Sequence, residues 1–277
     1  MINYNGKLQQ AESPSITSEN RGFKFGDAIF ETVKANKSKI FFWEDHYFRL
    51  MASMRMLRMK IPMEFTLEFL QDEIAKTINS LDSSSPFFRA RLTVCRKNGG
   101  LYTPNTNEID YIIEVGETNW KIKESYKLDV FKDFYNYSGT LSNIKTNNRL
   151  INTLASIYAK ENNLDNCLLV NERKGVAEVA NGNIFVVKGN TIKTPALSEG
   201  CIKGIARKKV IEILQKNTDY TLEENTISPF EIQKADEVFI TNAIMGIQPV
   251  TQYKKKKLNT EFGKKLAKSF KILQITG

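Results

Sequence analysis

The pattern of apolar and polar residues along the chain predicts a mixture of strands and helices. Residues 87–96 alternate strongly between apolar and polar side chains, with Arg89 and Arg91 on the same face, which is typical of a strand. Apolar residues at helical spacing predict helices over residues 45–59, which Asp45 would cap, and over residues 66–81, 206–216 and about 260–273. We predict further strands over residues 2–10, 39–43, 111–115, 127–131, 166–170, 184–187, 191–194 and 237–240, a loop at residues 13–18, and a loop or short helical turn running into a strand over residues 22–33.

Strands and helices alternate in two halves of the chain, which predicts an α+β fold class. The polar stretch at residues 117–125 is the candidate linker between these halves. We therefore predict a smaller N-terminal α+β domain at residues 1–116 and a larger C-terminal domain at residues 126–277.

The stretch that follows Lys145 has the pattern of an amphipathic helix. One face of this helix would be apolar and buried: Leu150, Ile151, Leu154, Ile157 and Tyr158. Ser142 and Asn143 stand just before it as plausible caps, so Lys145 would lie at the helix entry, where the peptide N–H groups disfavour a positive charge. A lysine so placed deprotonates more easily, and only a neutral amine attacks a carbonyl carbon. The alternative is an ordinary solvated lysine, which is the commoner case in a lysine-rich chain.

The composition narrows the class of protein. The chain has 277 residues, of which 41% are hydrophobic and 26% charged, as is ordinary for a soluble globular protein of one large or two smaller domains. Cys95, Cys167 and Cys201 are far apart in sequence, which argues against a disulfide framework or a zinc site and favours a cytoplasmic location. His46 is the single histidine, so we expect no metal site built from a histidine cluster. The first residues lack the pattern of a signal peptide and no apolar run is long enough to span a bilayer, so we expect no membrane association.

The net charge of +9 has more than one interpretation. A basic, solvated surface is the simplest, and the run of lysines at residues 254–257 has no interleaved aromatic residues, as a solvated turn would have. Nucleic-acid binding by a non-catalytic basic protein is the alternative that this run raises. A third interpretation is that the positive charge attracts anionic substrates and a phosphorylated cofactor.

Five further motifs favour a reactive Lys145 over an ordinary solvated lysine. They cover residues 21–32 (RGFKFGDAIFET), 45–50 (DHYFRL), 178–185 (EVANGNIF), 203–207 (KGIAR) and 235–243 (ADEVFITNA). Together with Lys145, and in this order, they resemble the class IV aminotransferase family, the fold-type IV enzymes that use pyridoxal 5′-phosphate (PLP). That family includes branched-chain and D-amino-acid aminotransferases and aminodeoxychorismate lyase, and the resemblance runs from about residue 18 to about residue 250.

The resemblance implies a fold and a cofactor. It implies a two-domain architecture like that of D-amino-acid aminotransferase, with PLP in the cleft between the domains, and a homodimer in which a loop of one subunit reaches the site of the other. It assigns to Lys145 the Schiff base with the cofactor and the transfer of a proton between the substrate and the cofactor. It assigns Glu178 to the pyridine nitrogen, where an ionised carboxylate keeps that nitrogen protonated. Without the resemblance, a turn residue after Gly175 is an equally good interpretation of Glu178.

The resemblance also implies how the cofactor phosphate is bound. Arg49 matches the family's arginine, whose planar guanidinium suits phosphate oxygens. A helix N-terminus at residues 204–206 would supply backbone N–H groups. The family often has threonine where this chain has Ala206, so a side-chain hydroxyl is absent there. The residues that the resemblance assigns to the cofactor are Arg49, Lys145, Glu178, Asn183, Gly204, Ile205, Ala206, Thr241 and Asn242.

The sequence determines the substrate less well than the fold and the cofactor. The resemblance assigns Phe30, Arg96, Tyr102 and Asn148 to it, and Arg96 with Lys97 could contact a carboxylate or could be solvated turn residues. Residues 147–150 are similar to those of some aminodeoxychorismate lyases, whereas Leu101 stands where those lyases carry an arginine. Leu150 stands where branched-chain enzymes often have a tyrosine.

The sequence thus predicts a PLP-dependent aminotransferase that moves an amino group between an amino acid and a 2-oxo acid. The alternative is an aminodeoxychorismate lyase that releases pyruvate and 4-aminobenzoate, and the remote alternative is the non-catalytic basic binding protein. In the two enzymatic cases we expect small-molecule substrates, a homodimer and no nucleic-acid partner.

Overall fold

The computed structural model describes residues 1–12 and 16–276, so part of the loop expected at residues 13–18 lies outside the described residues. The chain divides into two compact units. Unit 1 comprises Met1–Asn119 together with Lys145–Asn148, and unit 2 comprises Trp120–Ile144 and the chain from Arg149 onward. The four residues around Lys145 are thus joined to unit 1, although they lie between two segments of unit 2 in the sequence.

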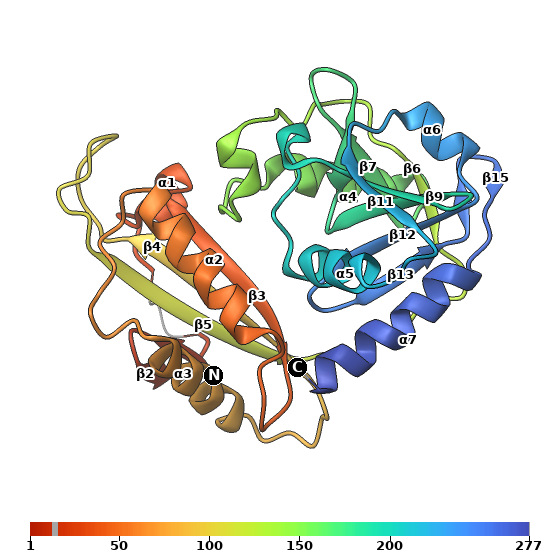
Figure 1. Ribbon diagram of the computed structural model, residues 1–277. Helices are drawn as coiled ribbons and strands as arrows, with labels where there is room; N and C mark the ends of the chain where they lie inside the picture. The colour runs from red at the N-terminus through yellow and green to blue at the C-terminus, as the bar shows by residue number, and fades with distance from the viewer. Residues whose placement is uncertain (13–15, 277) are drawn as a thin grey trace. The chain divides into compact units, whose positions relative to one another are not determined.

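Unit 1 is an antiparallel sheet with helices (Figure 1). Its strand order is β2-β1-β5-β4-β3. Its elements are β1 (Ile2–Tyr4), β2 (Lys7–Gln9), α1 (Arg21–Phe25), β3 (Ala28–Ala35), α2 (Trp43–Met56), α3 (Leu67–Asn79), β4 (Phe88–Arg96) and β5 (Ile109–Glu117). The single strand expected at residues 2–10 is a hairpin instead, because Asn5 and Gly6 both have positive φ and reverse the chain.

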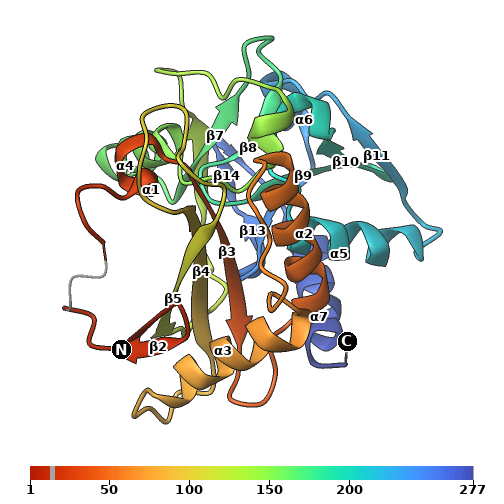
Figure 2. The ribbon, with the colours of Figure 1, turned by 90° about the vertical axis from the view of Figure 1, so that its left-hand side faces the viewer.

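Helices α2 and α3 pack on the same face of the sheet formed by β3, β4 and β5 (Figure 2). Strand residues alternate between the two faces, so Glu31 and Val33 of β3 point toward these helices while Phe30 points to the other face. The face under the helices is apolar and buried, for example at Ile74 of α3 and Leu92 of β4. Burial of such side chains is the main source of stability for a layer of helices on a sheet.

Unit 2 contains two sheets with the orders β11-β10-β9-β12-β13 and β15-β14-β6-β7-β8. Its elements are β6 (Lys127–Val130), η1 (Thr140–Asn143), α4 (Leu150–Glu161), β7 (Asn166–Val170), β8 (Val176–Val179), β9 (Asn183–Lys188), β10 (Thr191–Pro195), η2 (Leu197–Glu199), α5 (Ile205–Gln215), β11 (Thr221–Asn225), α6 (Pro229–Lys234), β12 (Glu237–Asn242), β13 (Gly246–Val250), β14 (Gln252–Tyr253), β15 (Lys256–Lys257) and α7 (Glu261–Thr276). Buried apolar residues of both sheets form one core cluster, among them Leu128, Leu168, Ile184 and Ile240. Helices α5 and α7 cover the sheet that contains β12 (Figure 1).

Several predicted elements are confirmed almost to the residue. Strand β4 and helices α3 and α5 match the predicted ranges within one or two residues. Thr66 caps α3 by accepting a hydrogen bond from the backbone N–H of Phe69. The inward positions predicted for α5, Val210, Ile211 and Leu214, are all buried.

The prediction around residues 39–59 is partly wrong. Residues 39–43 do not form a strand: Ile40 makes only an isolated bridge to Ala35. Helix α2 already begins at Trp43, and its N-cap is Phe42, which has a left-handed backbone conformation and makes no side-chain cap. Asp45 therefore lies inside the first turn, where a carboxylate is favourable toward the helix dipole without being the cap. The helix ends at Met56 and not at residue 59, because Arg58 has a positive φ.

The prediction for the helix after Lys145 is also wrong at its start. Helix α4 begins at Leu150, five residues after Lys145, and Ser142 and Asn143 belong to the short helix η1. The buried positions of α4 are Ala155 and Ala159, with Ile151, Leu154 and Tyr158 packed against the same cluster, whereas Leu150 and Ile157 are exposed. The helix-dipole argument for Lys145 therefore does not apply.

No helix within residues 1–12 and 16–276 is long and apolar enough to cross a membrane.

Candidate active site

The backbone of the Lys145 segment runs along the outer edge of the sheet of unit 1. Phe30 donates its backbone N–H to the carbonyl of Lys145 at 2.9 Å, and Asn147 donates to the carbonyl of Ala28 at 2.9 Å. Ile29 and Thr146 form an antiparallel bridge between these bonds. The edge of β3 thus holds the lysine in an extended conformation, which is why no helix forms there.

The side chain of Lys145 lies beside an aromatic ring and near a second cation. Its Nζ is 4.3 Å from the centroid of the Phe30 ring. The guanidinium carbon of Arg91 is 3.9 Å from the same centroid, and Arg91 Nη2 donates to Asn147 Oδ1 at 3.1 Å. Cations are attracted to the face of an aromatic ring, so Phe30 orients both groups.

A buried cluster of three charged or titratable residues lies on the other face of β3. Arg49 of α2 donates from Nε to Glu31 Oε1 at 2.7 Å and from Nη2 to Glu31 Oε2 at 2.6 Å. The Nδ1 atom of His46 is 2.7 Å from Glu31 Oε2. Glu31 and His46 are 2% and 1% exposed, so the cluster is almost sealed from water. We call these three residues the Glu31 cluster.

The protonation states of the Glu31 cluster follow from its contacts. Burial alone raises the pKa of Glu31, but the Arg49 charge and the hydrogen bond from His46 outweigh it and lower the pKa to about 2. Burial lowers the pKa of His46 more than the bond to Glu31 raises it, and the positive charges of Arg49 and Lys145 lower it further. The imidazole is therefore neutral at pH 7 and donates from Nδ1 to the ionised carboxylate.

Glu178 lies in strand β8 of unit 2, so the interpretation as a turn residue is wrong. It is 3% exposed, and its Oε2 accepts a hydrogen bond from the backbone N–H of Ile202 at 2.9 Å. Ile202 belongs to the segment that leads into helix α5. Its carbonyl oxygen also accepts a hydrogen bond from Asn183 Nδ2 at 2.9 Å. Glu178 and Asn183 thus fix the approach to α5 from one side.

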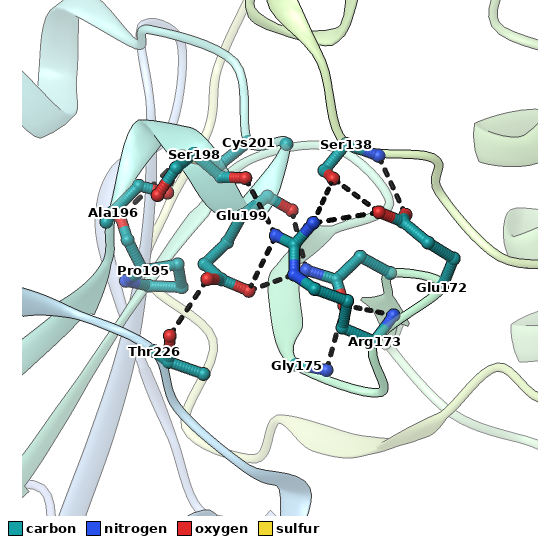
Figure 3. A network of polar contacts seen from close by, with 12 residues as sticks. Ser138, Glu172, Arg173, Gly175, Pro195, Ala196, Ser198, Glu199, Cys201 and Thr226 are labelled. Carbon is teal, nitrogen blue, oxygen red and sulfur yellow. Dashed lines mark hydrogen bonds and ion pairs between the residues drawn. The ribbon is translucent and has the colours of Figure 1, made fainter.

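A network of polar contacts fixes the same segment from the other side (Figure 3). The buried carboxylate of Glu199 accepts from Asn171 Nδ2 at 2.6 Å and from Thr226 Oγ1 at 2.8 Å. Arg173 donates to the carbonyl of Ser198 at 2.9 Å and lies within ion-pair distance of Glu199. The segment Leu197–Gly204 is therefore held in place by side chains that are themselves hydrogen-bonded.

The N-terminus of α5 forms a corner with strands β9 and β12. Gly204 is the N-cap of α5 and no side chain caps this end, where the first N–H groups of a helix have no partner within it. A Cβ atom on Gly204 would lie 2.0 Å from Asn183 Oδ1, so a larger residue here would displace the Asn183 side chain. Asn183 is the register partner of Thr241 on β12, and Thr241 Oγ1 is buried without a hydrogen-bond partner. We call Asn183, Gly204–Ala206, Thr241 and Asn242 the α5 corner.

The α5 corner has the chemistry of an anion site. Backbone N–H groups and the positive end of the helix dipole favour a negatively charged group. A buried hydroxyl without a partner is costly, and an anion oxygen would supply the missing acceptor. Asn242 is used structurally: its Oδ1 accepts from the N–H groups of Ile244 and Met245.

Arg96 has a structural environment that the sequence did not suggest. It is buried and donates from Nε to Asp27 at 2.9 Å, from Nη2 to the carbonyl of Leu57 at 2.7 Å, and from Nη1 to Arg58 and Asn107. It is therefore not a solvated turn residue. These bonds use four of its five N–H groups, and its contact with the substrate stays a prediction.

Each of the other residues assigned to the substrate contacts α1, its C-cap or the Lys145 segment. Tyr102 is 90% exposed, and its ring centroid is 5.6 Å from that of Phe25. Asn148 donates to the carbonyl of Gly26 at 3.4 Å. Phe30 lies two residues beyond Ala28, at the Lys145 segment.

Sequence reasoning missed three functional or supporting residues: Glu31, His46 and Arg91. The spacing of His46 and Arg49 by three residues on a helix is a signal that both share a face. No signal in the sequence links either of them to Glu31. Among the described residues, no group of three or more histidine, cysteine, aspartate or glutamate side chains is arranged to hold a metal ion.

Comparison with known proteins identifies the family of the chain. Residues 28–253 match the model of the family described as amino-transferase class IV. D-alanine aminotransferase of Staphylococcus haemolyticus is 25% identical over 261 residues, which are 90% of this chain and 87% of that protein. Aminodeoxychorismate lyase of Vibrio harveyi is 26% identical over 238 residues, which are 83% of this chain and 84% of that protein.

A solved structure shows the same fold. The branched-chain amino acid aminotransferase of Thermobaculum terrenum, in its PLP form, superposes with a TM-score of 0.85 over 100% of this chain and 94% of that one, at 19% identity. Because the family model covers most of the sequence, the chain belongs to the class IV aminotransferase family. The predicted α+β architecture of a fold-type IV enzyme is confirmed.

Proposed function

We propose that the protein is a PLP-dependent aminotransferase that moves an amino group between an amino acid and a 2-oxo acid. The observation that carries the proposal is the buried hydroxyl of Thr241, which has no partner and lies in the corner that the uncapped N-terminus of α5 forms. This corner fits a phosphate group, and Glu178 lies buried in the same unit. The PLP form of the structural relative and the family match support the cofactor.

PLP, when bound, supplies an electron sink that stabilises negative charge at the substrate's α-carbon. In this proposal Lys145 carries the proton that leaves the α-carbon, and Phe30 and the edge of β3 hold the amine in place to do so. Glu178, an acceptor in a buried position, holds a proton at the pyridine nitrogen. The α5 corner binds the phosphate through backbone N–H groups and the Thr241 hydroxyl.

Arg49 remains a proposed ligand of the phosphate. Its bidentate bond to Glu31 uses Nε and one hydrogen of Nη2, and it fixes the plane of the guanidinium. A guanidinium carries five N–H groups, so Arg49 can donate to Glu31 and to a phosphate oxygen at the same time.

The test is an absorption spectrum of the purified protein with PLP, followed by titration with L- and D-amino acids. The proposal expects a visible band that an amino acid removes and a 2-oxo acid restores. The Lys145→Ala variant should lose the band and at least about 10²- to 10⁴-fold of the activity. A Lys145→Ala protein with the activity of the wild type would refute the role of Lys145.

A second candidate is an aminodeoxychorismate lyase, which the similarity to the Vibrio harveyi lyase supports. It predicts pyruvate release from aminodeoxychorismate without any amino acceptor. A coupled assay for pyruvate, run beside the transamination assay on the same preparation, distinguishes the two. The uncharged side chain of Leu101, exposed at a loop tip, offers no positive charge to a second carboxylate and favours the aminotransferase.

We also propose that the protein is a cytoplasmic homodimer. Large apolar side chains of unit 2 are exposed on both sides of the Lys145 segment in the sequence, such as Tyr137 and Leu150. Exposed apolar side chains of this size are typical of surfaces that associate. Sedimentation of the wild type should give the mass of two chains and that of Leu150→Glu a single chain. A fully active wild-type monomer would contradict the dimer.

A further inference from the structure

Asn143 lies two residues before Lys145 and binds the backbone of the segment that leads into α5. It is the last residue of η1. Its Nδ2 donates to the carbonyl of Leu197 at 2.9 Å and to that of Cys201 at 2.7 Å. Its own carbonyl accepts from the backbone N–H of Lys203 at 3.3 Å. Asn143 is therefore tied by three hydrogen bonds to a segment that begins 54 residues later in the sequence.

The two sides of this segment bind different partners. Asn143 binds the carbonyl before Ile202 and the N–H after it. The N–H and the carbonyl of Ile202 itself bind Glu178 and Asn183. In extended backbone these groups point alternately to opposite sides, which accounts for the division. The segment is therefore held by Asn143 on one side and, on the other, by two residues that the family resemblance assigns to the cofactor.

Asn143 also lies between the peptide that precedes Lys145 and the N-terminus of α5. One residue, Ile144, separates it from the lysine, and Ile144 is buried with its carbonyl accepting from Arg149 Nη2. In the other direction, the segment that Asn143 binds ends at Gly204, the N-cap of α5. Both connections are short and fixed by hydrogen bonds, which limits the freedom of the backbone on either side of Asn143.

A second asparagine binds the same segment farther from the lysine. Asn136 Nδ2 donates to the carbonyl of Gly200 at 3.0 Å, and Asn136 is buried. It lies nine residues before Lys145. A Cβ on Gly200 would lie 3.0 Å from Ser138 Cα, so the chain after Asn136 packs closely on the segment. Asn136 thus supports the segment without being next to the lysine, and it is a matched control for Asn143.

We propose that Asn143 is a positioning residue that couples the two attachments of PLP, the covalent bond at Lys145 and the phosphate contacts at the α5 corner. The inference rests on the proposed function. The covalent bond forms between the Lys145 nitrogen and the aldehyde carbon of PLP, and the aldehyde oxygen leaves as water. Two attachments of one molecule reinforce each other only when their spacing fits that molecule. Asn143 acts through Lys145, by fixing that spacing.

The test uses two ligands that separate the two attachments. PLP has both groups, whereas pyridoxamine phosphate has the phosphate but an amine in place of the aldehyde, so it forms no bond with Lys145. Fluorescence titration measures the dissociation constant of each ligand for the wild type, Asn143→Ala, Asn143→Asp, Lys145→Ala, the double variant Asn143→Ala/Lys145→Ala and the control Asn136→Ala. Urea unfolding without any ligand measures the stability of each protein.

In Asn143→Ala we expect the dissociation constant of PLP to rise about tenfold and that of pyridoxamine phosphate to change by less than about threefold. Asn143→Asp should lose at least as much PLP affinity, because an aspartate of the same size has no N–H to donate and turns an ionised oxygen toward two carbonyls.

Two further comparisons separate this role from a merely structural one, which would weaken both ligands alike. In the Lys145→Ala background, Asn143→Ala should change the PLP constant by less than about threefold, since Asn143 acts through Lys145. Asn136→Ala should lower the stability to a similar extent as Asn143→Ala, while its PLP constant stays within about threefold of the wild type.

Three results would overturn the inference: an unchanged PLP constant in Asn143→Ala, an equal loss of affinity for both ligands, or a further tenfold loss when Asn143→Ala is added to Lys145→Ala. If Asn143→Ala does not fold, Asn143→Asp gives the same comparison between the two ligands. A wild-type protein that binds PLP no more tightly than Lys145→Ala, without a visible band, would instead refute the proposed function. A normal band together with any of the three results refutes only the role of Asn143.

Discussion

The Glu31 cluster and the α5 corner are both buried and polar, but they differ in how their groups are satisfied. In the Glu31 cluster, one carboxylate accepts hydrogen bonds of 2.6–2.7 Å from both Arg49 and His46. In the α5 corner, the hydroxyl of Thr241 has no partner and no side chain caps the helix. The groups of the Glu31 cluster are hydrogen-bonded to one another. The α5 corner has hydrogen-bond donors for an acceptor that the chain does not supply.

The difference is not a general property of the two units. The Glu199 network in unit 2 is as fully hydrogen-bonded as the Glu31 cluster in unit 1 (Figure 3). A native fold tolerates few buried polar groups without partners, and such groups concentrate where a ligand completes them. We therefore expect substitutions in the Glu31 cluster to change the stability of the protein itself, and substitutions in the α5 corner to change the affinity for PLP.

The largest effect is expected for Glu31→Gln. The substitution removes the negative charge from a site that keeps the Arg49 cation buried, so the free energy of unfolding should fall by about 3–5 kcal/mol. Urea unfolding without PLP measures this. Glu114→Gln on β5 is the matched control, since the Glu114 side chain is 57% exposed and should change the stability little. Equal stability of Glu31→Gln and Glu114→Gln would contradict the interpretation of the cluster.

The next effect is expected for Gly204→Ala at the α5 corner. The new Cβ would overlap Asn183 Oδ1 and push it away, which should cost about 1–3 kcal/mol of stability and weaken PLP binding. Gly116→Ala is the control, because nothing lies within 4 Å of the Cβ position there. Titration of PLP by fluorescence measures the affinity. An affinity equal in both variants would argue against phosphate binding at this helix end.

A smaller effect, with opposite signs in two variants, is expected for threonine to valine substitutions. Thr241→Val removes a buried hydroxyl without a partner, so the stability without PLP should rise or stay equal while PLP affinity falls about tenfold. Thr194 is equally buried, but its Oγ1 donates to the carbonyl of Ile184 at 2.8 Å. Thr194→Val should therefore lose about 1 kcal/mol of stability and keep its PLP affinity. Thermal unfolding with and without PLP separates the two patterns, and a stability loss in both would contradict the comparison.

The smallest effect is expected from the titration of His46. Its folded-state pKa is lowered below the ordinary value of 6.5, so below pH 6.5 the unfolded chain binds a proton that the folded chain does not. Stability is therefore fully present above pH 6.5 and is lost as the pH falls toward the folded-state pKa. Glu31 titrates in a separate window, between pH 4.5 and about 2. The free energy of unfolding should fall less between pH 6.5 and 5 in His46→Gln than in the wild type, and an identical slope would refute the assignment.

The sequence predicted the elements whose signals are local. The apolar periodicity of residues 66–81 and the strict alternation of β4 depend on neighbouring residues only, and both predictions are confirmed. The cap of α2 was predicted wrongly because the positive φ of Phe42 depends on packing and not on the residue type. The short strand β8, which contains Glu178, has four residues and no distinct period, so the sequence could not separate it from a turn.

The site was predicted less completely, because its contacts join distant segments. The apolar periodicity after Lys145 predicted a helix entry there, but hydrogen bonds of Lys145 to Phe30 and of Asn147 to Ala28 hold the segment at a sheet edge. Lys145 and Phe30 are 115 residues apart in the sequence. The structural contacts of Arg96 were also missed, because the sequence does not show that Asp27 and two backbone carbonyls bind it. Such pairings depend on which strands are adjacent, and residue spacing alone does not encode that.

The central proposal is that Lys145 binds PLP covalently and that the α5 corner binds the PLP phosphate. The most direct measurement is reduction of the PLP-loaded protein with borohydride, which fixes a lysine-bound pyridoxyl group, followed by proteolysis and mass analysis. The account predicts one modified peptide, with the added mass on Lys145, and a strong loss of labelling in Gly204→Ala at a limiting PLP concentration. A label spread over other lysines, or its absence from Lys145, would contradict the account.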